Sequence, residues 1–580
     1  MENLPLLPGG PAGPEPPLRP APDQASAELR FRDLGHWLYT HNPFYAVSAA
    51  LVFWGLRSSF DLHVHGFHTF AMMGGLAGYT LVLAIAAFVV IRLGKVWDDG
   101  RSLLLLVILM LLATSVSFDG ALAIEPVGGT LCCAAGLLLS VLLSEGLLWG
   151  LRVRLPALFR LPYYLVIGLF FVYPVALRWL VVDEPDSPAT QWALFAFPSL
   201  AAAAFLLLLP AVWRGAGYVR NNGTPWPWPW YPFMVFFMMG LGVCGRSFYL
   251  CVSMHTAGGF GTIFAPYFVV PFLLVANLLV LEMGAVAGWT GALRTAMAAP
   301  LGLIVLASIP PGGRLGARFL QETFLPTIGS GPLLLTALAV AALYGWAVRR
   351  RVPYAVESLC AALLVLAVVR PDTVDWTTVR TYPQAFPILA IGAIQGVQAL
   401  RRPGALRCLM ALGCFVIAAT LEFRETPLTV YHGAVPAHLM LGAVMLVGAA
   451  FSGPFARWLQ HAGAVLLLLG AVAAVTGSPV VTGDLPPAWL SVYAVAAILT
   501  ALGYGYLVRN RLYLASAAAG VVYWLALGSM QGYRQLRPVV SGLDYILSGL
   551  LSLVVAMLIS LAKMGAPQRW LAHYRQGRRR

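Results

Sequence analysis

The residue with the clearest chemical potential is an arginine inside a long apolar segment. Arg246 lies well within the apolar run that begins at Tyr231. Its guanidinium offers five N–H donors in a planar fork, a geometry that suits a carboxylate or a phosphate. A charge in the middle of a membrane span costs at least about 2.5–3.5 kcal/mol, so the side chain must face a partner or water. Arg246 therefore either forms a structural ion pair, for which Asp544 has a suitable predicted depth, or binds an anionic substrate.

Two prolines in the following apolar segment favour the second interpretation. Pro266 and Pro271 have no backbone N–H, so each would leave a carbonyl free if it lay inside a helix. Broken helices of this kind line substrate cavities in membrane transporters. Because the two prolines and Arg246 are predicted at a similar depth, we expect them to form a site for an anionic or zwitterionic group.

A later apolar segment carries two further polar residues on one helix face. Gln395 lies three residues from both Gly392 and Gln398, so the three share one side of the helix. Hydrogen bonding to a neighbouring helix explains such glutamines. The lining of a polar substrate cavity is the alternative.

Three histidines, His63, His65 and His68, fall within the first predicted outer loop. Neutral imidazole is the commonest metal ligand, so this group suggests a metal or haem site, although its spacing matches no regular zinc pattern. Histidines at the membrane interface without a ligand are the alternative. The seven cysteines form no CxxC pair, and no sequence motif indicates a cofactor, which stays unknown.

The elements that would position all these residues are membrane-spanning helices. Hydrophobic residues make up 59% of the chain and charged residues only 10%, whereas soluble proteins have about 25% charged residues. The apolar blocks are long enough to cross a hydrocarbon core of about 30 Å. The sequence therefore predicts an all-α, polytopic integral membrane helical bundle of about eighteen transmembrane helices (sixteen to eighteen). The blocks extend from Pro43 to Leu56 and then centre near residues 80, 113, 138, 169, 202, 242, 275, 303, 338, 361, 392, 413, 442, 465, 498, 520 and 551.

The distribution of charge predicts the orientation of the bundle. The net charge of +14 comes from arginines in short groups between apolar blocks, so it indicates topology and not nucleic-acid binding. With alternating crossings and the N-terminus inside, the inner segments hold 27 of the 37 basic residues. Both termini are thus predicted in the cytoplasm. Arginine far outnumbers lysine, which indicates a GC-rich coding bias and hence a bacterial inner membrane.

The predicted domain organisation is simple. Residues 1–35 form a Pro-rich, disordered cytoplasmic tail, residues 36–565 the transmembrane domain and residues 566–580 a basic cytoplasmic tail. The predicted loops are too short for a soluble domain. The expected partners are the lipid bilayer and other membrane proteins or a second copy of the chain.

Three classes of function are compatible with these features. A transporter or flippase for a small anionic, zwitterionic or lipid-like substrate fits best, because the loops are short and polar residues lie within spans. The second is a membrane-embedded enzyme with an outer-face Asp/His site, of the lipid-linked transferase type or dependent on metal or haem. It requires the outer acids Asp61, Asp119 and Glu125 to meet the histidines. The third is a non-catalytic structural or assembly subunit.

The predicted topology can be tested with reporter fusions. Reporters at both termini, in the Arg349–Arg351 loop and in the Arg401–Arg402 loop should give cytoplasmic signals, because clustered arginines stay inside. Reporters near His65 and Asp183 should give external signals. An external signal from any arginine-rich loop would contradict the alternation.

Overall fold

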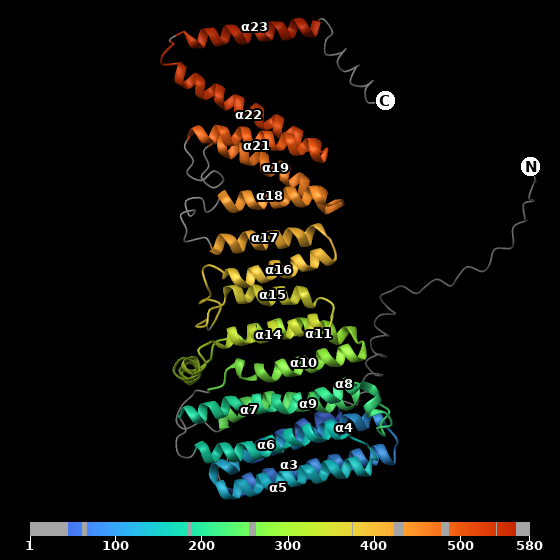
Figure 1. Cartoon of the computed structure of the whole chain (residues 1–580). Coiled ribbons are helices and arrows are strands. Elements are labelled where there is room, and N and C mark those ends of the chain that lie inside the picture. Colours follow the sequence, from blue (N-terminus) through green and yellow to red (C-terminus); the bar gives the residue numbers. More distant parts are fainter. Residues whose placement is uncertain are drawn as a thin grey trace, which may run out of the picture. The chain divides into compact units, whose positions relative to one another are not determined.

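A computed structural model describes residues 44–60, 66–181, 187–253, 263–373, 375–422, 434–476, 487–540 and 542–563 (Figure 1). Within these ranges every regular element is a helix and there is no strand. The predicted tails, residues 1–35 and 566–580, lie outside the described ranges. The contacts divide the chain into two units, Met1–Arg380 and Thr381–Arg580.

The first unit contains most of the helices. They are α2 (Phe44–Phe60), α3 (Gly66–Arg92), α4 (Trp97–Ile124), α5 (Pro126–Gly150), α6 (Ala157–Val181), α7 (Pro188–Leu206), α8 (Leu209–Arg214), η1 (Gly215–Val219), α9 (Trp230–Ser253), η2 (Pro266–Val269), α10 (Val270–Ala287), α11 (Thr290–Ala307), α12 (Arg314–Arg318), the π-helix η3 (Phe319–Phe324), α13 (Leu325–Ile328), α14 (Pro332–Arg349) and α15 (Ala355–Val368).

The second unit continues the pattern of apolar helices joined by short connections. Its helices are α16 (Ala385–Arg401), α17 (Ala405–Glu422), α18 (Ala434–Ala450), α19 (Pro454–Thr476), α21 (Pro487–Val508), α22 (Arg511–Leu536) and α23 (Leu543–Lys563).

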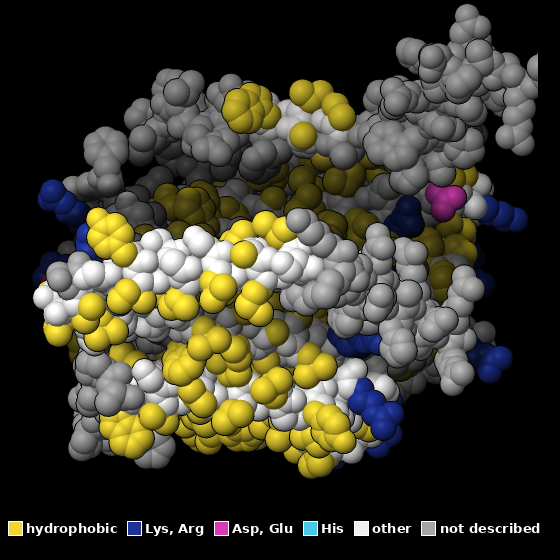
Figure 2. All heavy atoms as spheres, turned by 90° about the horizontal axis from the view of Figure 1, so that it is seen from above, with side chains coloured by type: hydrophobic (Ala, Val, Ile, Leu, Met, Phe, Trp, Pro, Cys, Tyr) yellow, Lys and Arg dark blue, Asp and Glu magenta, His cyan; other side chains and the backbone are white. Residues whose placement is uncertain are grey.

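A helix lies over each of the eighteen predicted apolar blocks, which confirms the all-α prediction. Thirteen described helices are long and apolar enough to cross a membrane, and four shorter ones are also apolar. Large apolar side chains such as Val82, Leu142 and Phe237 are more than half exposed, as expected of residues that face lipid. Figure 2 shows hydrophobic side chains spread over one face, with Lys and Arg towards its edges. The chain is thus a multi-pass integral membrane protein. The number of crossings and their orientation stay predictions.

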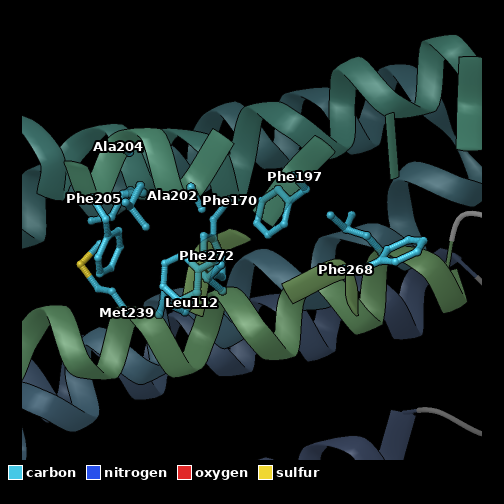
Figure 3. Close-up of a cluster of buried hydrophobic side chains, with 14 of the residues drawn as sticks. Leu112, Phe170, Phe197, Ala202, Ala204, Phe205, Met239, Phe268 and Phe272 are labelled. Carbon is cyan, nitrogen blue, oxygen red and sulfur yellow. The ribbon is translucent and has the colours of Figure 1, made fainter. Parts of the chain in front are cut away.

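The centre of unit 1 is an aromatic core contributed by α4, α6, α7, α9 and α10 (Figure 3). The rings of Phe205 and Phe272 meet edge to face with centroids 4.9 Å apart, and those of Phe170 and Phe197 lie 5.9 Å apart. Such pairs add to the stabilisation that burial gives each ring. This core fixes the rotation of α9, the helix that carries Arg246.

Close helix packing in unit 2 depends on a small residue. A side chain added at Gly392 of α16 would lie 3.1 Å from Cβ of Cys414 and 3.3 Å from the carbonyl oxygen of Ala411, both on α17. The absence of a side chain therefore lets the two helices approach closely, as the Gly392/Gly396 spacing suggests.

Candidate functional site

Arg246 forms a buried, bidentate ion pair with Asp119 of α4. Arg246 Nη1 donates to Asp119 Oδ2 at 2.7 Å and Nη2 donates to Oδ1 at 2.8 Å. Both side chains are fully buried. Ser253 Oγ donates to Asp119 Oδ2 at 3.2 Å, and Arg246 Nη2 also lies 3.4 Å from the carbonyl oxygen of Phe170. The pair therefore joins α4 and α9 and reaches the backbone of α6.

A glycine on α9 lets the two charged helices come together. A Cβ at Gly242, one turn before Arg246, would lie 2.6 Å from Leu112 Cδ1. Leu112 in turn lies two turns before Asp119 on α4. Because residues four and seven apart share a helix face, the packing of Leu112 on Gly242 sets the register that brings the carboxylate to the guanidinium.

The predicted ion-pair partner is thereby corrected from Asp544 to Asp119. Asp544 lies in unit 2, where it pairs with Arg537 at 3.5 Å and accepts a hydrogen bond from Tyr533. Asp119 was assigned to an outer loop, yet it lies inside α4 and is buried. The predicted depth of an acid in the membrane does not identify the ion-pair partner of Arg246. Helix packing and rotation decide which acid meets it.

The predicted role of the two prolines also needs correction. Pro266 opens the 3₁₀ helix η2, and Pro271 lies in the first turn of α10, so neither interrupts a helix. The carbonyl of Tyr267, four residues before Pro271, accepts a hydrogen bond from the N–H of Val270. Proline suits the start of a helix because its missing N–H would have no intrahelical partner there. The expected free carbonyl before Pro271 is therefore absent.

The remaining predicted site residues stay predictions. Gln395 is buried and Gln398 half-buried on α16 of unit 2, whereas Arg246 lies in unit 1. His63 and His65 lie outside the described residues, and His68 falls in α3 with its side chain not described. Among the described residues, no group of three or more His, Cys, Asp or Glu side chains is arranged to hold a metal ion.

A second polar cluster surrounds Glu282 on α10. Trp213 Nε1 and Arg350 Nη2 donate to Glu282 Oε2 at 2.9 and 2.8 Å, and Trp346 Nε1 donates to Oε1 at 2.6 Å. The carboxylate is buried, whereas the two indoles and the guanidinium are part-exposed. This cluster ties α10 to α8 and α14.

A polar cavity lies at the joint between α3, α5 and α6. It has a volume of about 880 Å³ and is lined by four exposed arginines, Arg92, Arg152, Arg154 and Arg160, together with Glu145. Arg160 Nε donates to Glu145 Oε1 at 2.9 Å. No carboxylate among the described residues forms an ion pair with the other three arginines. We call this cavity the arginine pocket.

Residues on both sides of the Trp-Pro run 226–230, Asn222, Gly223 and Tyr231, hold the arginine-bearing loop in place. The N–H of Arg154 donates to the carbonyl oxygen of Asn222 at 2.8 Å, and Tyr231 donates from its hydroxyl to the carbonyl oxygen of Arg154 at 2.9 Å. Gly223 has φ +84°, and a Cβ there would lie 2.3 Å from the carbonyl oxygen of Arg152. The loop 151–156 is thus clamped on its backbone while its side chains face the cavity.

An apolar cavity adjoins the arginine pocket between α4, α5 and α9. Its volume is about 110 Å³, and it shares three lining residues with the arginine pocket: Leu148, Val153 and Leu155. Trp226 also lines it, and the buried Nε1 of that indole has no partner among the described residues. A charged recess and an apolar one thus lie side by side and share one wall.

Sequence reasoning treated the pocket arginines only as topology determinants. Their spacing was the available signal, because Arg152, Arg154 and Arg160 follow Glu145 closely in the sequence. Arg92, however, is distant in sequence from the others, and only the packing of α3 against α5 brings it to the same cavity.

The ion pair generates a stability prediction. Arg246→Gln should lower the free energy of unfolding by about 3–5 kcal/mol, because it leaves a buried carboxylate without its partner. The double change Arg246→Met with Asp119→Leu should recover most of this loss, since both charges are removed together. Thermal unfolding of the purified protein in detergent measures both effects.

The matched control for this pair is Asp544. Adding Asp544→Asn to Arg246→Gln should restore nothing, because Asp544 pairs with Arg537. Recovery with Asp544→Asn, or none with Asp119→Leu, would show that the assigned partner is incorrect.

The clamp on the arginine loop generates a second prediction. Gly223→Ala should cost about 1–3 kcal/mol from its left-handed backbone alone, and its new Cβ should push the 151–156 loop outward. Trypsin should then cleave faster after Arg152 and Arg154. Gly217→Ala is the control, because a Cβ there meets no atom within 4 Å. Equal cleavage of the two variants would exclude the clamp.

The chain matches no protein-family model, no curated protein and no solved structure. Its function is therefore inferred from the geometry of its own residues. In the arginine pocket, three of the four arginines form no ion pair with a described carboxylate, so their donors are open to a ligand.

Proposed function

We propose that this integral membrane protein binds an anionic amphiphile in the arginine pocket and moves it across the membrane as a transporter or flippase. The observation that carries the proposal is that the arginine pocket and the apolar cavity lie side by side and share three lining residues, Leu148, Val153 and Leu155. An amphiphile has the same two parts in the same order, a charged head and an apolar chain.

The charge of the pocket favours a phosphate or carboxylate head. Arg92, Arg152 and Arg154 add three positive charges to the Arg160–Glu145 pair. Like charges that share a cavity repel each other, and an anion removes that repulsion while it accepts several charge-assisted hydrogen bonds. Arginine suits this role because its planar fork matches two oxygens of one phosphate.

The apolar cavity supports a ligand with a hydrophobic part. Its walls are mainly Leu, Val and aromatic side chains of α4, α5 and α9. Trp226 contributes an unused indole N–H, which suits an acceptor such as an ester oxygen next to the head group. A free inorganic anion would use the arginines but would gain nothing from this cavity.

Arginines at the end of a span often act only as topology determinants, which would explain their positions without a ligand. Topology determinants need no fixed backbone, however. The loop 151–156 is held by Asn222, Gly223 and Tyr231, which lie far along the chain. A loop whose backbone is held in place around a cavity supports a role for that cavity in binding. The alternative enzyme would use Asp119, which is paired with Arg246. Asp61, His63 and His65 lie outside the described residues.

The proposal can be tested on vesicles with a fluorescent phosphatidic acid as the probe. The double variant Arg152→Gln with Arg154→Gln should bind the probe about 10- to 30-fold more weakly, since each arginine contributes about 1 kcal/mol at an anionic surface. The same variant should lose transfer of the probe between leaflets, measured by quenching the exposed fluorophore.

The control is Arg509→Gln with Arg511→Gln in unit 2. These arginines have the same spacing, and Arg509 shares the positive φ of Arg152, 55° against 57°. Both residues are exposed. Normal transfer in the first variant, or an equal loss in the control, would refute the proposal. Weaker binding combined with no transfer in the wild type would indicate a binding protein and not a transporter.

A further inference from the structure

A separate groove runs along α10 between α8 and α14. Its volume is about 440 Å³. Its walls are apolar and include Leu209 of α8, Leu274 and Leu278 of α10, and Ala339 and Ala342 of α14. From Leu274 to Glu282 the groove follows α10 for about 12 Å, at 1.5 Å per residue. The small alanines on α14 keep it open on one side.

One end of the groove is polar. Glu282, Trp213 and Trp346 line it there, and Arg350 completes the cluster. Trp213 and Trp346 are 53% and 39% exposed, so their rings lie at the rim while their N–H groups point inward to Glu282. A tryptophan with polar surroundings on one side and apolar surroundings on the other is typical of the membrane interface.

Glu282 orients Arg350 without using up its donors. One nitrogen, Nη2, donates to Glu282 Oε2, and the side chain of Arg350 is still 39% exposed. A guanidinium has five N–H groups, so several face outward. Arg349 and Arg351 are exposed beside it. The end of α14 beside Glu282 therefore carries three exposed arginines, and Glu282 is the one carboxylate among the described residues that pairs with any of them.

We propose that this groove is a binding site for a bilayer phospholipid with a net negative head group. One acyl chain lies along α10 against Leu274 and Leu278, and the phosphate accepts hydrogen bonds from Arg350. Charge complementarity selects this occupant, because basic recesses between membrane helices retain anionic lipids. Glu282 is a positioning residue that holds Arg350 and the two indoles at the depth of the head group.

This site is independent of the arginine pocket. The two share no lining residue, and they are built from different helices of unit 1. A lipid in this groove stays bound to the folded protein, whereas the ligand of the arginine pocket is moved across the membrane. Failure of either proposal therefore leaves the other standing.

The test fills the groove from an exposed position. Ala342→Trp should occupy the space of the acyl chain without disturbing the core, since Ala342 is exposed on α14. Native mass spectrometry of protein taken from phosphatidylglycerol nanodiscs should then show at least a fivefold loss of bound lipid. Leu338→Trp adds bulk to an exposed position of the same helix outside the groove, and it should retain the lipid.

The head group is tested separately. Arg350→Gln should abolish the preference for phosphatidylglycerol over phosphatidylcholine, whereas Arg314→Gln, which removes one charge from an exposed site on α12, should preserve it. Glu282→Gln should reduce this preference in the same direction as Arg350→Gln. Equal retention of both lipids by the wild type, or full retention by Ala342→Trp, would overturn the proposal.

Discussion

The buried pair of Arg246 and Asp119 is the constraint on which unit 1 depends. Two charges within a membrane bundle are tolerated only when each satisfies the other, because neither lipid nor packed side chains can solvate them. The bidentate geometry fixes α9 against α4 in both rotation and depth. The contact of Arg246 with the carbonyl of Phe170 extends the same constraint to α6. A slip of one residue along α9 would turn the guanidinium away by about 100°, so the pair admits one register.

The same helix carries this constraint to the arginine pocket. From Arg246 back to Pro232, just after the non-helical Tyr231, α9 spans about 21 Å at 1.5 Å per residue. Tyr231 holds the carbonyl of Arg154, and the preceding loop holds the backbone of Arg152 and Arg154 through Asn222 and Gly223. The depth of α9, set by the ion pair, thus determines where the arginine loop lies. A buried ion pair and the arginine pocket are thus linked through α9 and the kink at Tyr231 where it begins.

Charged groups serve two purposes in this chain, and their surroundings distinguish them. Asp119, Arg246 and Glu282 are buried with their oxygens or terminal nitrogens engaged, so they tie helices together. Arg152, Arg154 and Arg350 are exposed at cavities and keep donors available. Both cavities pair such donors with apolar walls, which suits ligands that are themselves part charged and part apolar. In a membrane these are lipids and lipid-like substrates.

The sequence alone determined the helical class and the position of every apolar block, because hydropathy and helix length are properties of contiguous residues. It also determined that Arg246 needs a partner, since the cost of an unpaired charge does not depend on the fold. Only the tertiary structure decided that the partner is Asp119 and not Asp544, and that Arg92 shares a cavity with Arg152 and Arg154. These relations join residues far apart in the chain. They depend on how each helix is rotated against its neighbours, which the packing of Leu112 on Gly242 sets and local sequence patterns do not reveal.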